Sequence, residues 1–182
     1  MRVIAGEAKG KPLVPAKDGG TRSATDRIRE TLFAILDPRL EGARVLDLFA
    51  GAGTLGIEAL SRGASDAVFV ERGARALAAL AHNLERTGLG PRATLSRADV
   101  LSFLAKASGP FDLVLCDPPF ADTAVLTATL AHPGLRGVLA SDALVVVRIH
   151  KKHRPALPAG ARVVREREVG EETLMFLEYD AA

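Results

Sequence analysis

The sequence predicts an α/β domain with a mostly parallel sheet, helices on both faces and an antiparallel hairpin at one edge. From residue 44 onward, apolar strand-like runs alternate with helical stretches, which is typical of a parallel sheet covered on both faces. After residue 150 the alternation stops, and two strand-like runs follow that are joined by the short connection 169–172. We therefore expect the last two strands to pair with each other at the edge of the sheet.

The individual elements are expected as follows. Residues 2–5 and 11–14 suggest an N-terminal β-hairpin with lysines at its tip. A helix then opens, with Ser23 or Thr25 as its cap, and Asp37-Pro38 ends it. The sheet strands are expected at 44–49, 67–71, 93–97, 111–116 and 143–149, with hairpin strands at 162–168 and 173–179. Helices are expected at 55–62, 74–87, 100–107 and 123–130.

Length and composition indicate one globular domain. A chain of 182 residues with 48% hydrophobic and 25% charged residues is long enough for one packed core and too short for two ordinary ones. We divide it into an N-terminal hairpin and helix, residues 1–40, and an α/β core, residues 41–182. Its start lacks the pattern of a signal peptide, and no apolar run approaches the ~20 residues of a spanning helix. We expect a cytoplasmic monomer.

Basic residues are concentrated at the front of the chain. Residues 1–29 hold seven basic and three acidic side chains, a net charge of +4, whereas the whole chain carries +2. Such a segment is as typical of nucleic-acid binding as of a solvated tail. The single cysteine, Cys116, lies in an apolar run without a cationic neighbour, so we interpret it as a core residue and not as a nucleophile. No residues have the spacing of a metal site.

A glycine-rich turn follows the first core strand, in the stretch 45–56 (VLDLFAGAGTLG). In an open α/β sheet this turn lies at the carboxyl ends of the strands, where cofactors bind. The spacing of Gly51, Gly53 and Gly56, followed by Glu71, satisfies the dinucleotide fingerprint and leaves NAD open. A carboxylate at Asp47 would repel a pyrophosphate and attract an ammonium group, which favours S-adenosylmethionine.

Acids recur at three successive strand ends, Asp47, Glu71 and Asp99. At one edge of the sheet they could serve the amino-acid end, the ribose hydroxyls and the adenine amino group of such a cofactor. Asp99 could equally be only the cap of the helix that follows it. The predicted cofactor site therefore consists of these three acids and of the residues beside them: Phe49, Ala50, Gly51, Gly53, Thr54 and Val100.

The stretch 113–120 (LVLCDPPF) ends an apolar strand in an acid, two prolines and an aromatic ring. Because proline lacks an N–H group and has a fixed φ, this rigid tip offers only acceptors. The Asp117 carboxylate and the Pro118 carbonyl could each accept one N–H of an exocyclic amine, while Phe120 stacks on the base. We predict Asp117, Pro118, Pro119 and Phe120 to be catalytic, and a proline-stiffened turn is the structural alternative.

Residues 117–120 together with the glycine turn resemble the amino-methylating branch of the Rossmann-like S-adenosylmethionine-dependent methyltransferases. The stretches MRVIAG (1–6), TRSATDRIRETLF (21–33) and VLDLFAGAG (45–53) resemble the bacterial 16S ribosomal RNA guanine-N2 methyltransferases, the RsmD family. This resemblance runs through essentially the whole chain. It implies a seven-stranded sheet, S-adenosylmethionine as cofactor, a guanine of the small ribosomal subunit as substrate, and an N-terminal hairpin and helix that touch RNA and cofactor.

Candidate RNA contacts lie in three places. The resemblance implies that Arg22, Thr25 and Arg27 border the entrance to the site. The lysines of the hairpin tip and the basic cluster 150–154 are further candidates, although the cluster could equally be a solvated loop. From these two places we select Lys9, Lys11, Lys151 and Lys152.

Two other functions remain open on the sequence. The tetrapeptide at 117–120 also permits an adenine-N6 DNA methyltransferase, although no domain for reading a DNA sequence is evident. A noncatalytic module that binds NAD or another nucleotide is the second alternative. Because no separate RNA-binding domain is evident either, we expect the RNA substrate to be 16S rRNA within an assembled or partly assembled small subunit.

Overall fold

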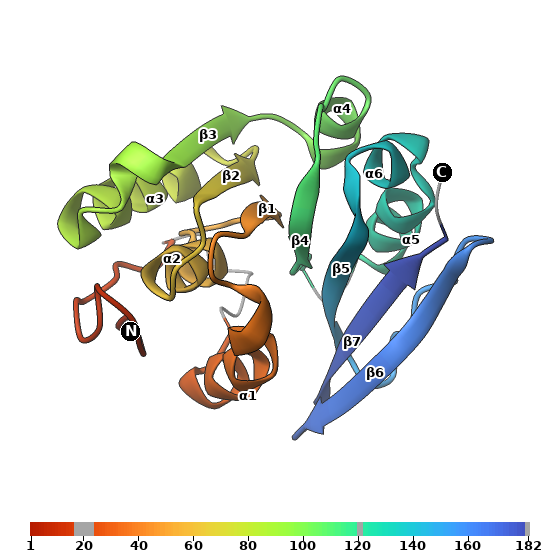
Figure 1. The fold of residues 1–182 in the computed structure, drawn as a ribbon, viewed down its shortest axis with the longest axis horizontal. Coiled ribbons are helices and arrows are strands. Elements are labelled where there is room, and N and C mark those ends of the chain that lie inside the picture. Colours follow the sequence, from red (N-terminus) through yellow and green to blue (C-terminus); the bar gives the residue numbers. More distant parts are fainter. Residues whose placement is uncertain (17–23, 120–121, 181–182) are drawn as a thin grey trace.

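The fold is taken from a computed structural model, which describes residues 1–16, 24–119 and 122–180. Its strands form one sheet in the order β3-β2-β1-β4-β5-β7-β6 (Figure 1). The strands are β1 (Arg44–Leu48), β2 (Asp66–Glu71), β3 (Ala93–Arg97), β4 (Phe111–Cys116), β5 (Leu139–His150), β6 (Ala161–Val169) and β7 (Glu172–Tyr179). The first five strands are parallel, and β6 and β7 are antiparallel. The predicted seven-stranded sheet with a C-terminal antiparallel hairpin is confirmed.

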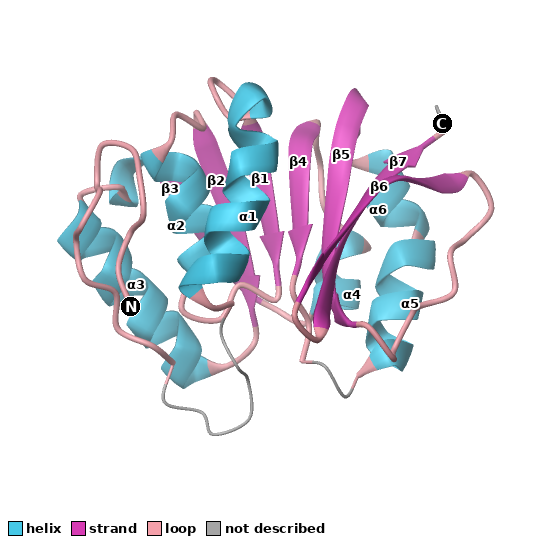
Figure 2. Ribbon diagram, turned by 90° about the horizontal axis from the view of Figure 1, so that it is seen from below, coloured by secondary structure: helices cyan, strands magenta, loops and turns pink. Residues whose placement is uncertain are grey.

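Helices cover both faces of the sheet (Figure 2). One face carries α1 (Asp26–Leu36), α2 (Thr54–Ser61) and α3 (Ala74–Thr87), and the other carries α4 (Val100–Leu104), α5 (Thr123–Ala131) and α6 (Pro133–Gly137). Because strand side chains alternate, Val45 and Leu113 belong to the first core, while Leu46 and Val114 belong to the second. The strands between the two cores are therefore nearly continuous apolar runs, as expected for a parallel sheet.

The structure adds short elements that the sequence pattern did not predict. Two 3-10 turns, Asp37–Arg39 and Gly90–Arg92, and the helix α6 lie in segments interpreted as connections. The helix α6 begins at Pro133, and the His132 ring caps it by accepting from the Gly134 N–H at 3.0 Å. Helix α1 is capped by Thr25, one of its two predicted caps, whereas Ser23 lies outside the described residues.

The prediction of an N-terminal hairpin is wrong. Residues 1–16, which we call the N-terminal segment, contain one isolated antiparallel bridge, between Arg2 and Pro12, and no strand. The backbone N–H groups of Ile4 and Ala5 donate to the Glu58 carboxylate of α2, at 2.9 and 3.0 Å. Around the bridge, the N–H groups of Val3, Gly10 and Leu13 donate to carbonyls across the segment, whereas Ile4 and Ala5 satisfy their N–H groups on a helix, so no regular strand pair forms.

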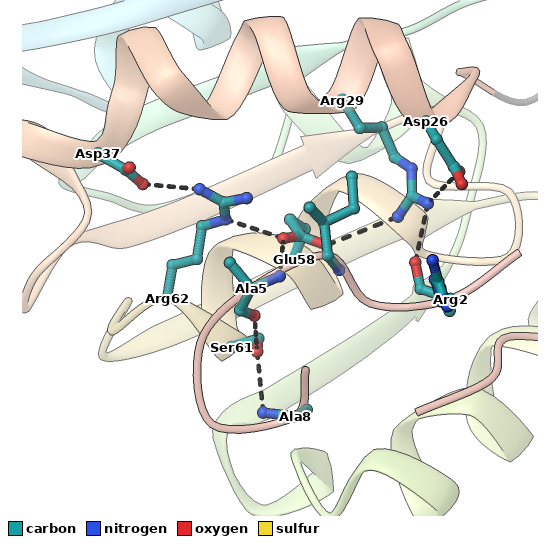
Figure 3. A network of polar contacts seen from close by, with 10 residues as sticks. Arg2, Ala5, Ala8, Asp26, Arg29, Asp37, Glu58, Ser61 and Arg62 are labelled. Atoms are coloured by element: carbon teal, nitrogen blue, oxygen red, sulfur yellow. Dashed lines mark hydrogen bonds and ion pairs between the residues drawn. The ribbon is translucent and has the colours of Figure 1, made fainter. Parts of the chain in front are cut away.

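The contact with α2 belongs to a buried polar network (Figure 3). Glu58 also accepts from Arg62 Nε at 2.8 Å and lies 3.6 Å from Arg29 Nη1, and the side chains of Glu58 and Arg29 are fully buried. The Ser61 hydroxyl donates to the Ala5 carbonyl at 2.6 Å. We call Glu58, Arg29 and Arg62 the Glu58 network. It joins the N-terminal segment, α1 and α2 into one unit.

A second anchor ties the N-terminal segment to α3 and to the glycine turn. The Asn83 side chain accepts from the Val14 N–H at 2.7 Å and donates to the carbonyls of Val14 and Ala52 at 2.9 and 3.0 Å. Asn83 is fully buried, and its amide joins the N-terminal segment to the glycine turn. Across the described ranges, none of the helices has the length and apolar character needed to cross a membrane.

Candidate active site

A cavity of about 310 Å³ opens at the carboxyl ends of the parallel strands. The strand order reverses between the neighbours β1 and β4, which is the switch point where open α/β sheets bind ligands. The cavity is lined by nine residues of the predicted cofactor and catalytic sites: Phe49, Ala50, Gly51, Thr54, Glu71, Asp99, Val100, Asp117 and Pro119. The structure therefore brings the glycine turn and the Asp117 loop to one cavity.

The glycine turn contains backbone conformations of positive φ, which glycine adopts readily but which also occur at Phe49. Phe49, directly after β1, has a φ of +63°, which is uncommon for a bulky residue, and it lines the cavity. Gly53, the N-cap of α2, has a φ of +80°, and a Cβ there would lie 2.1 Å from Leu80 Cδ1. A Cβ at Gly51 would meet no atom within 4 Å. The turn is therefore packed on its α3 side at Gly53 and open at Gly51.

Glu71 braces this turn from the end of β2. Its Oε2 accepts from the Gly51 N–H at 2.9 Å, and its Oε1 accepts from the Gly73 N–H at 2.7 Å. Each carboxylate oxygen has a second lone pair, and the residue lines the cavity. Glu71 can therefore hold the turn and still accept from a hydroxyl group in the cavity.

Asp47 lies behind the turn and does not line the cavity. Its carboxyl is 1% exposed and accepts from the Gly56 N–H at 3.0 Å. Burial raises the pKa of Asp47 to about 8, and the negative charges of Asp117 and Glu71 add to this rise while the Gly56 hydrogen bond opposes it. A Cβ on Gly56 would lie 3.0 Å from the Asp47 oxygen and 2.3 Å from the Phe69 ring, so glycine permits this close packing of helix and strand.

Asp99 performs the capping role that we considered as its alternative, and it also lines the cavity. Its Oδ1 accepts from the Leu101 and Ser102 N–H groups of α4, at 3.0 and 3.4 Å. Within the described residues its Oδ2 takes part in no hydrogen bond. One oxygen therefore caps the helix, and the other can accept from a donor in the cavity.

Asp117 follows β4 and is held by an arginine that the sequence reasoning missed. Arg148 of β5 donates through Nε to Asp117 Oδ1 at 2.6 Å and through Nη2 to Oδ2 at 2.9 Å. The third nitrogen of the guanidinium, Nη1, donates to Glu172 Oε2 at 2.8 Å. We call Asp117, Arg148 and Glu172 the Asp117 network. Burial raises the pKa of the Asp117 carboxyl, and the charge and hydrogen bonds of Arg148 oppose this rise.

The rest of the proline loop is placed as follows. The Pro119 carbonyl accepts from the Asp122 N–H at 3.0 Å, which turns the chain toward α5. Pro118 is buried and lies outside the lining of the cavity, and its carbonyl accepts no hydrogen bond from the described residues. Phe120 lies outside the described residues. The strand residue Cys116 is buried as expected, and burial raises the pKa of its thiol, which keeps it protonated.

The described residues that were predicted to contact RNA lie outside the lining of the cavity, and Arg22 is not among the described residues. Lys9 and Lys152 are exposed. Two other lysines have partners, because Lys11 Nζ donates to the Thr87 carbonyl at 2.8 Å and Lys151 Nζ to Glu171 at 2.6 Å. On α1, the Thr25 hydroxyl caps the helix by accepting from the Ile28 N–H, and Arg27 is exposed.

The sheet order, the glycine turn at its switch point and the acid–proline loop beside it define a methyltransferase of the α/β class. The comparison with protein families then gives the particular group. The family described as "Conserved hypothetical protein 95" matches residues 1–178, and the chain belongs to this family, the RsmD family.

Individual relatives agree with this assignment. The chain is 37% identical over 172 residues to the Ribosomal RNA small subunit methyltransferase D of Escherichia coli K12, which covers 94% of this chain and 86% of the relative. The corresponding protein of Haemophilus influenzae is 37% identical over 123 residues, 66% of this chain and 64% of the relative. The solved structure of yhhF from Escherichia coli matches with a TM-score of 0.86 and 34% identity, over 100% of this chain and 99% of that one.

Proposed function

We propose that the protein catalyses S-adenosylmethionine-dependent methylation of the exocyclic N2 amine of a guanine in 16S rRNA. The observation that carries this proposal is the single cavity lined both by the glycine turn and by Asp117. The names of its relatives point to ribosomal RNA of the small subunit as the substrate class. Guanine N2 rests on the resemblance of residues 1–53 to the guanine-N2 methylating family.

The residues around the cavity fit the proposed cofactor. Its volume of about 310 Å³ is within the range of small-molecule sites. Glu71 and Asp99 each keep an acceptor for the hydroxyl and amino groups of a nucleoside, and the open side of Gly51 leaves room for close approach to the backbone. When bound, S-adenosylmethionine supplies a methyl group on a sulfonium centre. Asp47 supports this site from behind through the Gly56 N–H.

Asp117 supplies the chemistry on the substrate side. The lone pair of an exocyclic base amine is delocalised into the ring, which makes the nitrogen a poor nucleophile. A carboxylate that accepts one N–H orients the amine and favours the positive charge that develops on nitrogen. The Pro118 carbonyl is the proposed second acceptor, and Phe120 is proposed to stack on the base.

The test is methyl transfer from labelled S-adenosylmethionine to unmodified small subunits and, separately, to naked 16S rRNA. We expect label in the RNA of one or both, and mass spectrometry of nuclease fragments should place it on one guanine as N2-methylguanine. Absence of transfer to either substrate would contradict the proposal. Label in adenine of added DNA would support the adenine-N6 alternative instead.

A binding measurement separates the proposed enzyme from a nucleotide-binding module. Calorimetric titration should show binding of S-adenosylhomocysteine and none of NAD. The reverse result would mean that the cavity serves a dinucleotide and that the acceptor pattern of Glu71 and Asp99 has been misinterpreted.

A further inference from the structure

The least expected feature near the cavity is an arginine inside an apolar strand. Arg148 lies in β5 within the run Val145-Val146-Val147-Arg148-Ile149, and its side chain is only 4% exposed. A buried guanidinium is costly unless its donors are satisfied and its charge is paired. Its three nitrogens satisfy this condition by donating to Asp117 and Glu172 at 2.6 to 2.9 Å. Arg148 also contributes to the lining of the cavity.

The geometry of this contact is specific. Two nitrogens of one guanidinium, Nε and Nη2, meet the two oxygens of one carboxylate, so the planar fork fixes both the distance and the plane of the Asp117 carboxylate. Each oxygen retains one further lone pair for another donor. Asp117 by itself is a short side chain at the start of a loop, and β4 alone does not determine how its oxygens are rotated.

Glu172 determines the position of the arginine in turn. It is the first residue of β7, and β5 lies between β4 and β7 in the sheet (Figure 1). His150, two residues after Arg148, pairs in register with Glu172, which places the glutamate beside the guanidinium. The C-terminal hairpin thereby reaches the active-site loop through one arginine.

We propose that Arg148, oriented by Glu172, is a positioning residue that holds the Asp117 carboxylate with its free lone pairs toward the substrate amine. This inference rests on the proposed function, because it assigns Asp117 the role of acceptor for that amine. It adds a charge requirement: Asp117 pairs with the Arg148 fork through both oxygens as an ion pair only while it is ionised.

Arg148 is the cation in direct contact with Asp117, and the groups around it are mostly acidic. Burial and the charge of Glu172 favour the protonated form of Asp117, whereas Arg148 favours the ionised form. From β1, Asp47 interacts with Asp117, and from β4 itself Cys116 does. Among the described residues, the other charged groups that line the cavity are Glu71, Arg72, Asp99 and Asp122. Removing Arg148 should therefore move the titration of Asp117 to higher pH.

The first experiment is the pH dependence of methyl transfer at saturating substrates in Arg148→Met and Arg148→Lys. In the wild type we expect the rate to fall as the pH decreases and Asp117 becomes protonated. In Arg148→Met we expect the midpoint of this acidic limb to rise by about 1–3 pH units, with a kcat about 100-fold lower at neutral pH. Arg148→Lys restores the charge but not the fork, so the limb should return toward the wild-type position while kcat stays low.

Glutamate variants separate orientation from charge. Glu172→Gln should lower kcat by about 10-fold, without raising the acidic limb, because the charge of Glu172 itself favours protonation of Asp117. The matched controls are Arg162→Met and Glu178→Gln, which break an ion pair of 2.7 Å between the exposed ends of β6 and β7. Both controls should retain the wild-type rate and pH profile. An unshifted limb in Arg148→Met, with the fold intact by circular dichroism, would overturn the inference.

A measurement without substrate keeps this test independent of the proposed function. The carboxyl carbon of Asp117 can be titrated by NMR in protein labelled at aspartate, with Asp117→Asn used for assignment. We expect its midpoint to be higher in Arg148→Met than in the wild type, and an equal midpoint would overturn the inference. If that shift is found but the wild type methylates no RNA, the proposed function fails while the control of Asp117 by Arg148 stands.

Discussion

The Glu58 network and the Asp117 network both pair a buried arginine with a carboxylate, but they have different roles. In the Glu58 network, the Glu58 and Arg29 side chains are both fully buried. Glu58 accepts from two backbone N–H groups and from Arg62, so its oxygens are occupied from three directions. In the Asp117 network the carboxylate is 14% exposed and meets only Arg148 among the described residues. The Glu58 carboxylate is enclosed and fills three of its four acceptor positions, and the Asp117 carboxylate keeps two free lone pairs beside a cavity.

This difference distinguishes a structural ion pair from a functional one by whether the carboxylate can still accept a donor from a ligand. A fully buried carboxylate that does not line the cavity is out of reach of a ligand, so Glu58 can only hold together the elements that contact it. A carboxylate fixed by a single arginine fork has the same rigidity and retains capacity for new donors. Removing the Glu58 carboxylate should therefore lower the free energy of unfolding, and removing the Asp117 carboxylate should lower the rate of methyl transfer.

The largest expected effect is on catalysis at Asp117. Asp117→Ala should reduce methyl transfer by about 10²–10³-fold or more, because the amine loses the acceptor that orients it. The affinity for S-adenosylhomocysteine, measured by calorimetry, should stay within a few-fold of the wild type. Asp37→Ala, which removes an exposed partner of Arg62, is the matched control and should leave the rate unchanged. A large loss of cofactor affinity in Asp117→Ala would place Asp117 in the cofactor site instead.

The next effect is on stability at Glu58. Glu58→Gln removes the carboxylate shared by Arg29 and Arg62, leaving the buried Arg29 with its ion pair to the exposed Asp26, and should lower the free energy of unfolding by about 3 kcal/mol. Urea denaturation measures it, and Glu85→Gln on the exposed side of α3 should change it by less than about 0.5 kcal/mol. Cofactor affinity should be retained, because Glu58 does not line the cavity. Full stability with lost activity would reverse the contrast between the two networks.

A third carboxyl, Asp47, shows what burial does when no arginine is in contact. Its pKa rises to about 8, so the folded state retains a proton that the unfolded chain releases near pH 4. The resulting stability is fully present below about pH 4 and is lost as the pH rises through 8. Asp47→Asn cannot ionise, so at pH 8 its free energy of unfolding should exceed that of the wild type by up to about 5 kcal/mol and should approach it at pH 4. The free energy of unfolding of both proteins is measured by urea denaturation as a function of pH. A constant difference between the two from pH 4 to pH 8 would contradict the burial of a neutral carboxyl at Asp47.

The sequence predicted the parts of the molecule that local patterns determine. The five parallel strands, the glycine turn and the C-terminal hairpin follow from apolar periodicity, glycine spacing and strand-end acids, and these signals lie within a few residues. The N-terminal hairpin was predicted wrongly because the partners of Ile4 and Ala5 lie on Glu58, more than 50 residues away. The pattern of residues 2–5 before Gly6 is typical of a strand. No local signal indicates that the acceptor for Ile4 and Ala5 is a side chain of α2.

Both buried networks were nevertheless marked in the sequence. Glu58 interrupts an apolar helix, TLGIEALS, and Arg148 interrupts an apolar strand, LVVVRIH. A lone charged side chain in an otherwise buried run has to be paired. Each position therefore predicts that an oppositely charged partner exists, but not which residue it is. Which partner it is depends on the order of strands in the sheet. The role of Arg148 therefore became visible only when β5 was placed between β4 and β7.

The smallest expected effects distinguish two lysines of the N-terminal segment. Both lysines are exposed, but Lys11 donates to the Thr87 carbonyl at the end of α3, at 2.8 Å, whereas the Lys9 side chain makes no hydrogen bond or ion pair with the described residues. Lys11→Glu puts a negative charge at a helix C-terminus and should cost about 1 kcal/mol of stability, and Lys9→Glu should cost less than about 0.5 kcal/mol. Thermal or urea denaturation of the two variants measures this difference.

Their effect on RNA tests whether the N-terminal segment has a role beyond packing. If both lysines face RNA phosphates, each charge reversal should weaken binding to 16S rRNA and lower the slope of log K against log salt by about 1. A change in slope for Lys9→Glu alone would mean that Lys11 remains committed to α3. Because the Glu58 network holds the segment in place, an unchanged slope in both variants would assign the segment to stability alone, like Glu58 itself.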